Sequence, residues 1–304
     1  MRSRAWHVLQ WVAGLLIVVF VIRYVARNWA EVRAADLAWD LSPPLALAGM
    51  AIVWVAFALL AEAWRRMVEA WGFALSWRDG AGIWLLSSMA KYVPGKVWAL
   101  AGMAAMAERR GIPAWCAAGS AVVLQLVSIG SGALVVAASG LAAGGAIPGP
   151  LALVGVAAGL LVIILLALWP PLARRAVAAV APAADLSHVP RAGTVGFGAM
   201  ANGLAWVGYG LAFWLFSRAC LPQAPIGLLE ATGAYTASYV AGVLAPFAPG
   251  GLGVREGVLV LALQGQVGLT TALALAAVAR LGMTASEILA TIPFLLRART
   301  AARD

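Results

Sequence analysis

Two short stretches place helix-breaking residues beside full charges within otherwise apolar sequence. Residues 92–96 read YVPGK, and residues 246–257 read PFAPGGLGVREG. Proline removes a backbone donor and glycine permits unusual torsion angles, so each Pro-Gly step is expected to interrupt a helix. A new helix is then expected to begin near Lys96 in the first stretch and near Val254 in the second. Because a helix N-terminus presents free N–H groups and about half a positive charge, each break offers a place for an anion.

Side chains around the two breaks favour the same ligand. The nearby cations are Lys91, Lys96 and Arg255, and the hydroxyl donors are Ser87, Ser88 and Tyr92. Together they predict a site for a negatively charged group, and in a lipid-rich setting a phosphate headgroup is the first candidate. Two alternatives stay open: Lys91 and Lys96 snorkel to the membrane interface, or Arg255 and Glu256 form ion pairs that only hold the structure together.

Two more ionisable residues lie in the last apolar segment of the chain. Arg280 and Glu287 are seven residues apart, which places them on one face of a helix. Ionisable residues inside a membrane span are candidates for function. We expect two ion pairs from them, Glu256 with Arg280 and Arg255 with Glu287, and a structural role is as compatible with these pairs as substrate contact. A cavity lined by Lys91 and Arg255 would favour transport.

The composition identifies an integral membrane protein. Of 304 residues, 63% are hydrophobic and 11% are charged, with a mean hydropathy of +0.93, whereas soluble domains carry about 25% charged residues. The net charge of +9 fits basic cytoplasmic loops better than nucleic-acid binding. The two cysteines and two histidines are isolated in the sequence, so neither a disulfide, nor a metal, nor another cofactor is expected.

Apolar segments of about 20 residues predict membrane-spanning helices. Six are expected, at residues 6–26, 44–62, 113–143, 150–169, 193–217 and 269–296. The interrupted segments 81–111 and 227–266 are expected to be re-entrant helical hairpins. The third span carries Ser128 and Gly132, a small-xxx-small pair suited to close helix packing. Segment 63–80 has apolar residues at helical spacing, including Trp64, Met67 and Val68, and predicts an interfacial helix on the cytoplasmic leaflet.

The distribution of basic residues orients this arrangement. With the N- and C-termini in the cytoplasm and both hairpins re-entrant, 13 of the 21 basic residues face the cytoplasm. The chain then forms one membrane domain, 1–304, of two inverted repeats. The first, 1–143, contains hairpin 81–111, and the second, 150–304, contains hairpin 227–266, entering from the opposite face. Interrupted segments at matching positions of inverted repeats indicate a substrate site.

The two motifs together resemble a known family. SSMAKYVPGKVW (87–98) and APGGLGVREG (248–257) are similar to the paired motifs of the lysylphosphatidylglycerol synthetase transmembrane family, also called flippase-like membrane proteins. The resemblance covers essentially the whole chain, and implies a helical bundle with two re-entrant elements that moves lipids between leaflets. The family's motif positions correspond to Lys91, Tyr92, Pro94, Gly95 and Lys96 in the first hairpin and to Pro249, Gly250, Gly251, Gly253 and Glu256 in the second.

One difference from the name-giving members affects the expected cargo. Those members carry a soluble aminoacyl transferase domain after the membrane region, and this sequence ends at Asp304 after RARTAARD, so we expect no transferase. Aminoacylated phosphatidylglycerol is therefore only one candidate. Other members of this broad family are associated with polyprenyl-linked sugars and with hopanoid lipids.

We therefore expect a lipid flippase or transporter, not an enzyme, in a bacterial cytoplasmic membrane. The cargo is an anionic phospholipid or a polyprenyl-phosphate-linked lipid, and homo-oligomerisation is left open. The alternatives are a membrane-embedded lipid-phosphate transferase and a lipid-binding partner subunit. Substrate-binding residues are expected to be Ser87, Ser88, Lys91, Tyr92, Lys96, Arg255, Glu256, Arg280 and Glu287. Residues that form the breaks are expected to be Pro94, Gly95, Pro249, Gly250, Gly251 and Gly253.

Overall fold

A computed structural model describes residues 39–92, 97–142, 190–245 and 248–300, with a few isolated positions between 156 and 178. Within these ranges every regular element is helical and none is a strand, which confirms the all-helical prediction. The expected span 6–26, most of the expected span 150–169, and Pro94, Gly95 and Lys96 lie outside the described residues.

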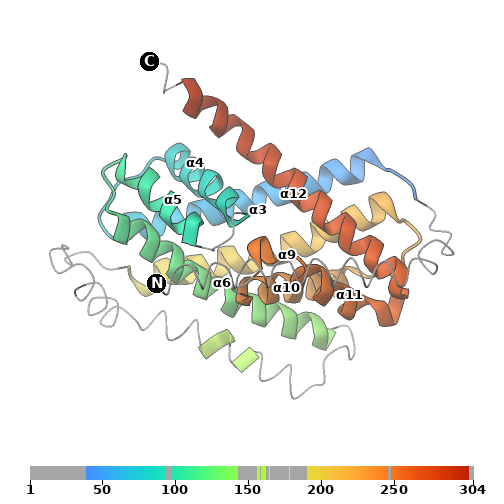
Figure 1. The fold of residues 1–304 in the computed structure, drawn as a ribbon. Coiled ribbons are helices and arrows are strands. Elements are labelled where there is room, and N and C mark those ends of the chain that lie inside the picture. Colours follow the sequence, from blue (N-terminus) through green and yellow to red (C-terminus); the bar gives the residue numbers. More distant parts are fainter. Residues whose placement is uncertain are drawn as a thin grey trace, which may run out of the picture.

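Four long apolar helices form the main body of the protein (Figure 1). They are α3 (Pro43–Ala70), α6 (Ala114–Ala142), α9 (Ala192–Cys220) and α12 (Leu269–Thr300). Each contains a stretch long and apolar enough to cross a bilayer. They correspond to the spans predicted at 44–62, 113–143, 193–217 and 269–296, so the protein is an integral membrane protein with four candidate spans in the described part of the chain.

Helix α9 lies at the centre of the packing. It runs along α3 and also contacts α6, α12 and α10 (Leu228–Leu244). Small residues permit close approach where α6 meets its neighbours: a Cβ added at Gly132 would lie 2.8 Å from Val240 Cγ2 and 3.2 Å from Trp206 Nε1. Trp206 Nε1 also donates to the carbonyl oxygen of Ser128 at 3.0 Å. The predicted role of Ser128 and Gly132 in helix packing is confirmed.

Two interrupted helix pairs complete the described fold. In the first, α4 (Trp77–Ser88) and the short 3-10 helix η1 (Met89–Tyr92) precede α5 (Val97–Glu108). In the second, α10 and the short 3-10 helix η2 (Pro249–Gly251) precede α11 (Val254–Val267). The two helices of each pair contact each other, and η1 contacts η2. We call the segment between α4 and α5 the first break and the segment between α10 and α11 the second break.

Glycine conformation explains the second break. Gly250, Gly251 and Gly253 have φ angles of 57°, 71° and 81°, a region that side chains with a Cβ rarely adopt. These conformations keep the chain off a regular helical path until α11 begins at Val254. The Glu256 carboxylate accepts a hydrogen bond from the Gly253 N–H at 2.7 Å, which satisfies a donor at the new helix start. These glycines lie where the sequence predicts the second break.

The prediction of an interfacial helix in segment 63–80 is wrong. Helix α3 continues to Ala70 without interruption, and Trp64, Met67 and Val68 are buried inside the protein. Trp64 Nε1 donates to the carbonyl oxygen of Ala117 in α6 at 3.2 Å. The apolar spacing is helical, as predicted, but the apolar face packs on a neighbouring helix and not on lipid headgroups.

The ends of the first interrupted pair lie close together. Arg110, just after α5, forms an ion pair with Asp79 in the first turn of α4, with 2.9 Å between Nη2 and Oδ1. The end of α5 therefore lies beside the start of α4.

Candidate functional site

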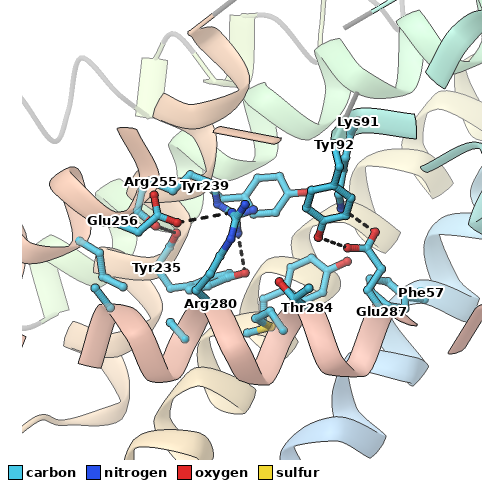
Figure 2. Close-up of a pocket in the computed structure, with 16 residues that line it drawn as sticks. Phe57, Lys91, Tyr92, Tyr235, Tyr239, Arg255, Glu256, Arg280, Thr284 and Glu287 are labelled. Carbon is cyan, nitrogen blue, oxygen red and sulfur yellow. Dashed lines mark hydrogen bonds and ion pairs between the residues drawn. The ribbon is translucent and has the colours of Figure 1, made fainter. Parts of the chain in front are cut away.

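One face of α12 is directed at both breaks (Figure 2). Glu287 on this face is 5% exposed and accepts three hydrogen bonds from the end of α4 and from η1. The donors are Lys91 Nζ at 2.5 Å, Tyr92 OH at 2.8 Å and Ser88 Oγ at 3.2 Å. The carboxylate therefore fixes the first break to α12. The neighbouring residue on α12, Ser286, contacts α3: its backbone oxygen accepts a hydrogen bond from Trp54 Nε1 at 2.9 Å. This bond fixes α12 to α3.

Arg280, two turns earlier on α12, makes the corresponding contacts with the second break. Its Nη1 lies 3.4 Å from Glu256 Oε1 and donates to the Gly250 carbonyl oxygen at 3.2 Å. Its guanidinium carbon lies 5.8 Å from the centre of the Tyr92 ring. A Cβ at Gly250 would lie 3.2 Å from Tyr92 Cδ1, so the two breaks meet at Tyr92 and Gly250.

The structure bears out one of the two expected ion pairs. The Glu256–Arg280 pair is confirmed. The expected Arg255–Glu287 pair is wrong, because Glu287 lies beside the first break and pairs with Lys91. Glu287 is seven positions after Arg280 on α12, a distance of about 10 Å along the helix axis, whereas the Arg255 side chain is directed toward α10.

Arg255 has an aromatic environment instead. Its Nη2 donates to Tyr235 OH at 2.8 Å, and its guanidinium carbon lies 3.9 Å from the centre of the Tyr239 ring. Its aliphatic stem passes between two glycines, since a Cβ at Gly242 or Gly251 would collide with Arg255 Cγ and Cδ. Within the described ranges, no ion pair joins Arg255 to a carboxylate.

Two cavities lie around this cluster. The larger has a volume of about 460 Å³ and the smaller about 40 Å³. Both are bordered by Phe57, Lys91, Tyr209, Tyr239, Arg255 and Glu287. The larger cavity extends toward α5 and α6 along a mostly apolar wall that includes several aromatic rings and a few polar groups, among them Gln125 and Asn202. An anion bound there would meet the guanidinium of Arg255 and the amine of Lys91.

Most of the sequence-predicted site residues that the structure describes come together here. The cluster consists of Ser88, Lys91, Tyr92, Arg255, Glu256, Arg280 and Glu287. Ser87 borders the larger cavity, but its hydroxyl donates to the Trp84 carbonyl oxygen. Lys96 lies outside the described residues. No group of three or more potential metal ligands occurs in the part of the chain that the structure describes.

Sequence reasoning missed the tyrosines that surround Arg255. Tyr235 and Tyr239 are four residues apart on α10, so they project from one face toward the start of α11. Tyr209 of α9 stacks nearly parallel to Tyr239, with ring centres 6.3 Å apart. The spacing of these two tyrosines within segment 227–266 was the sequence feature that could have indicated their shared face on one helix.

The fold and the site together define a helical integral membrane protein with a charged cavity between interrupted helices. The family model of the lysylphosphatidylglycerol synthase TM region matches residues 11–286. The chain belongs to this family, as its two motifs suggested. A comparison with curated protein sequences gives no match.

The ion pair of Glu287 predicts a stability effect. Glu287→Gln leaves Lys91 without its carboxylate, and because both groups are largely removed from water, we expect a loss of about 2–4 kcal/mol in unfolding free energy. Chemical denaturation in mixed micelles measures this loss. Arg110→Gln, which breaks the more exposed pair with Asp79, is the control, with an expected loss of about 0–1 kcal/mol. Equal losses in both variants would contradict a buried structural pair at Glu287.

Proposed function

We propose that this protein is a lipid flippase: it binds the phosphate-bearing headgroup of an anionic phospholipid or a polyprenyl-phosphate-linked lipid and moves the lipid between leaflets. The observation that carries the proposal concerns Arg255. This cation borders a cavity of about 460 Å³ and has no carboxylate partner among the described residues. Membership of the family, whose name refers to a phospholipid, supports the lipid as ligand.

Placing a charge within a membrane protein costs free energy. Ionisable groups at membrane depth are expensive and persist where they are paired or functional. Lys91 and Arg280 have carboxylate partners in Glu287 and Glu256. Arg255 has five N–H donors, of which one donates to Tyr235 within the described part of the chain. A phosphate group would accept from the donors that remain and would neutralise the charge.

The shape of the cavity suits a headgroup with its acyl chains left outside. Its volume falls in the range of about 300–1,000 Å³ that is usual for small-molecule sites. Its wall is mostly apolar, with the charges gathered near the breaks. In the proposed mechanism the headgroup enters beside Arg255 while the acyl chains stay in the bilayer, and access then changes from one leaflet to the other without chemical modification of the lipid.

The proposal includes the membrane topology expected from the sequence. Both interrupted pairs are re-entrant hairpins that enter from opposite faces of a bacterial cytoplasmic membrane, and the two halves are inverted repeats whose relative rocking switches access. The Arg110–Asp79 ion pair supports the first hairpin, because it joins the start of α4 to the end of α5. Contact between η1 and η2 supports a meeting of the two hairpins near the site.

Side-specific labelling tests the first hairpin. In a background with Cys116 and Cys220 replaced by alanine, Arg78→Cys and Arg109→Cys should both react with a membrane-impermeant maleimide from the cytoplasmic side. Arg218→Cys, predicted to face outside, is the control and should react from the other side only. Labelling of the positions at 78 and 109 from opposite sides would show that this segment crosses the membrane once.

Lipid retention tests the headgroup site. Native mass spectrometry of the purified protein should find anionic lipid enriched over its share in the source membrane. Arg255→Gln should reduce that enrichment about tenfold, because it removes the cation that meets the phosphate. Arg218→Gln is the matched control: Arg218 also contacts an aromatic ring and donates to the backbone, but it borders neither cavity.

Two results would contradict this proposal. One is retained lipid that mirrors the bulk membrane in the wild-type protein. The other is unchanged enrichment in an Arg255→Gln variant that keeps the wild-type unfolding temperature.

A further inference from the structure

The charged side chains around the two cavities do not balance. Among the described residues that border the cavities, three are cations and two are carboxylates, which leaves a net charge of +1. The cations are Lys91, Arg255 and Arg280, and the carboxylates are Glu256 and Glu287.

Both carboxylates are fixed by contacts other than their ion pairs. Glu287 also accepts from the hydroxyls of Ser88 and Tyr92. Glu256 accepts from the backbone N–H of Gly253 through Oε2, while Oε1 faces Arg280. These contacts hold each carboxylate beside its own cation. The larger cavity is bordered by the Lys91–Glu287 pair and Arg255, and the smaller cavity also by the Glu256–Arg280 pair. A ligand beside Arg255, which borders both cavities, therefore meets ion pairs that are already neutralised and one cation without a carboxylate partner among the described residues.

From this arrangement we propose that the site selects a headgroup with one negative charge, a phosphodiester, over a phosphomonoester with two. The inference rests on the flippase proposed above and specifies the charge of its cargo. A diester balances the net charge of +1, whereas a dianion leaves an uncompensated negative charge beside Glu256 and Glu287. Such a charge is costly where water is scarce and the effective dielectric constant is low.

The geometry of the donors supports the same selection. A phosphodiester has two unesterified oxygens, which match the planar donor fork of a guanidinium. A phosphomonoester adds a third oxygen and a second charge, which need another cation. The two other cations among the described residues that border the cavities, Lys91 and Arg280, already face carboxylates. The fixed carboxylates therefore disfavour binding of the headgroup with two negative charges.

A competition between two lipids tests the selection. The protein is equilibrated at alkaline pH with phosphatidylglycerol, a diester, and phosphatidic acid, a monoester, in equal amounts and with identical acyl chains. A phosphate monoester is then close to doubly charged, since its second pKa is about 6. Native mass spectrometry should find phosphatidylglycerol preferred about tenfold by the wild-type protein.

Glu256→Gln tests the cause of the preference. The amide oxygen of glutamine can still accept from the Gly253 N–H, but the site gains one net positive charge and Arg280 loses its carboxylate. Retention of phosphatidic acid relative to phosphatidylglycerol should rise about tenfold. Glu230→Gln, the same change in the first turn of α10 and away from both cavities, should leave the preference unchanged. Unfolding temperatures of all variants confirm that they fold.

The outcomes separate this inference from the proposed function. Equal retention of both lipids by the wild-type protein, with loss of both in Arg255→Gln, would overturn the charge selection and leave the headgroup site in place. A preference for the diester that Glu256→Gln does not change would likewise overturn the charge selection and leave the headgroup site in place. Retention of neither lipid would overturn the proposed function itself.

A soluble diester distinguishes a lipid site from a site for a free anion. Dimethyl phosphate carries the same single charge without acyl chains. Phosphatidylglycerol should remain bound in its presence, because the acyl chains also contribute to binding. Displacement of the lipid by an equal concentration of dimethyl phosphate would assign the site to a soluble anion and overturn the lipid assignment.

Discussion

The arrangement of the site depends on two ion pairs that extend from one face of α12. Glu287 binds Lys91 at the first break, and Arg280 binds Glu256 at the start of α11. Non-helical backbone in the interior of a membrane protein needs hydrogen-bond partners from within the protein, because lipid offers none. Arg280 supplies one by donating to the Gly250 carbonyl oxygen, and Glu256 supplies another by accepting from Gly253. The same four charges therefore hold the breaks together and neutralise one another.

The proposed function follows from Arg255, the cation that these two ion pairs do not include. Arg255 lies between the glycine-rich second break and the tyrosines of α10, on the wall shared by both cavities. Aromatic rings stabilise a guanidinium through cation–π contact, by about 0.5–2 kcal/mol, but leave its charge in place. In this environment the guanidinium stays charged and can bind an anion. In a membrane protein of this family, the proposed anion is a lipid headgroup.

Much of the fold was predictable because apolar length and helix-breaking residues are local properties of the sequence. The four described spans and the glycines of the second break are examples. The Arg255–Glu287 pair was predicted wrongly because sequence spacing does not say toward which neighbour a side chain points. The interfacial helix was predicted wrongly because an apolar helical face has the same spacing whether it meets lipid headgroups or, as at Trp64, another helix. The role of Tyr235 and Tyr239 depends on α10 packing against α11, which no local pattern reveals.

Leaflet exchange in proteoliposomes measures whether lipid passage depends on Arg255. Fluorescent phosphatidylglycerol is incorporated in both leaflets, and a membrane-impermeant reductant bleaches the label in the outer leaflet. If the account is right, wild-type protein lets the bleaching proceed beyond the outer-leaflet fraction, and Arg255→Gln stops it there, while Arg218→Gln exchanges lipid like the wild type. Exchange by Arg255→Gln at the wild-type rate would contradict the account, because headgroup passage would then not depend on this arginine.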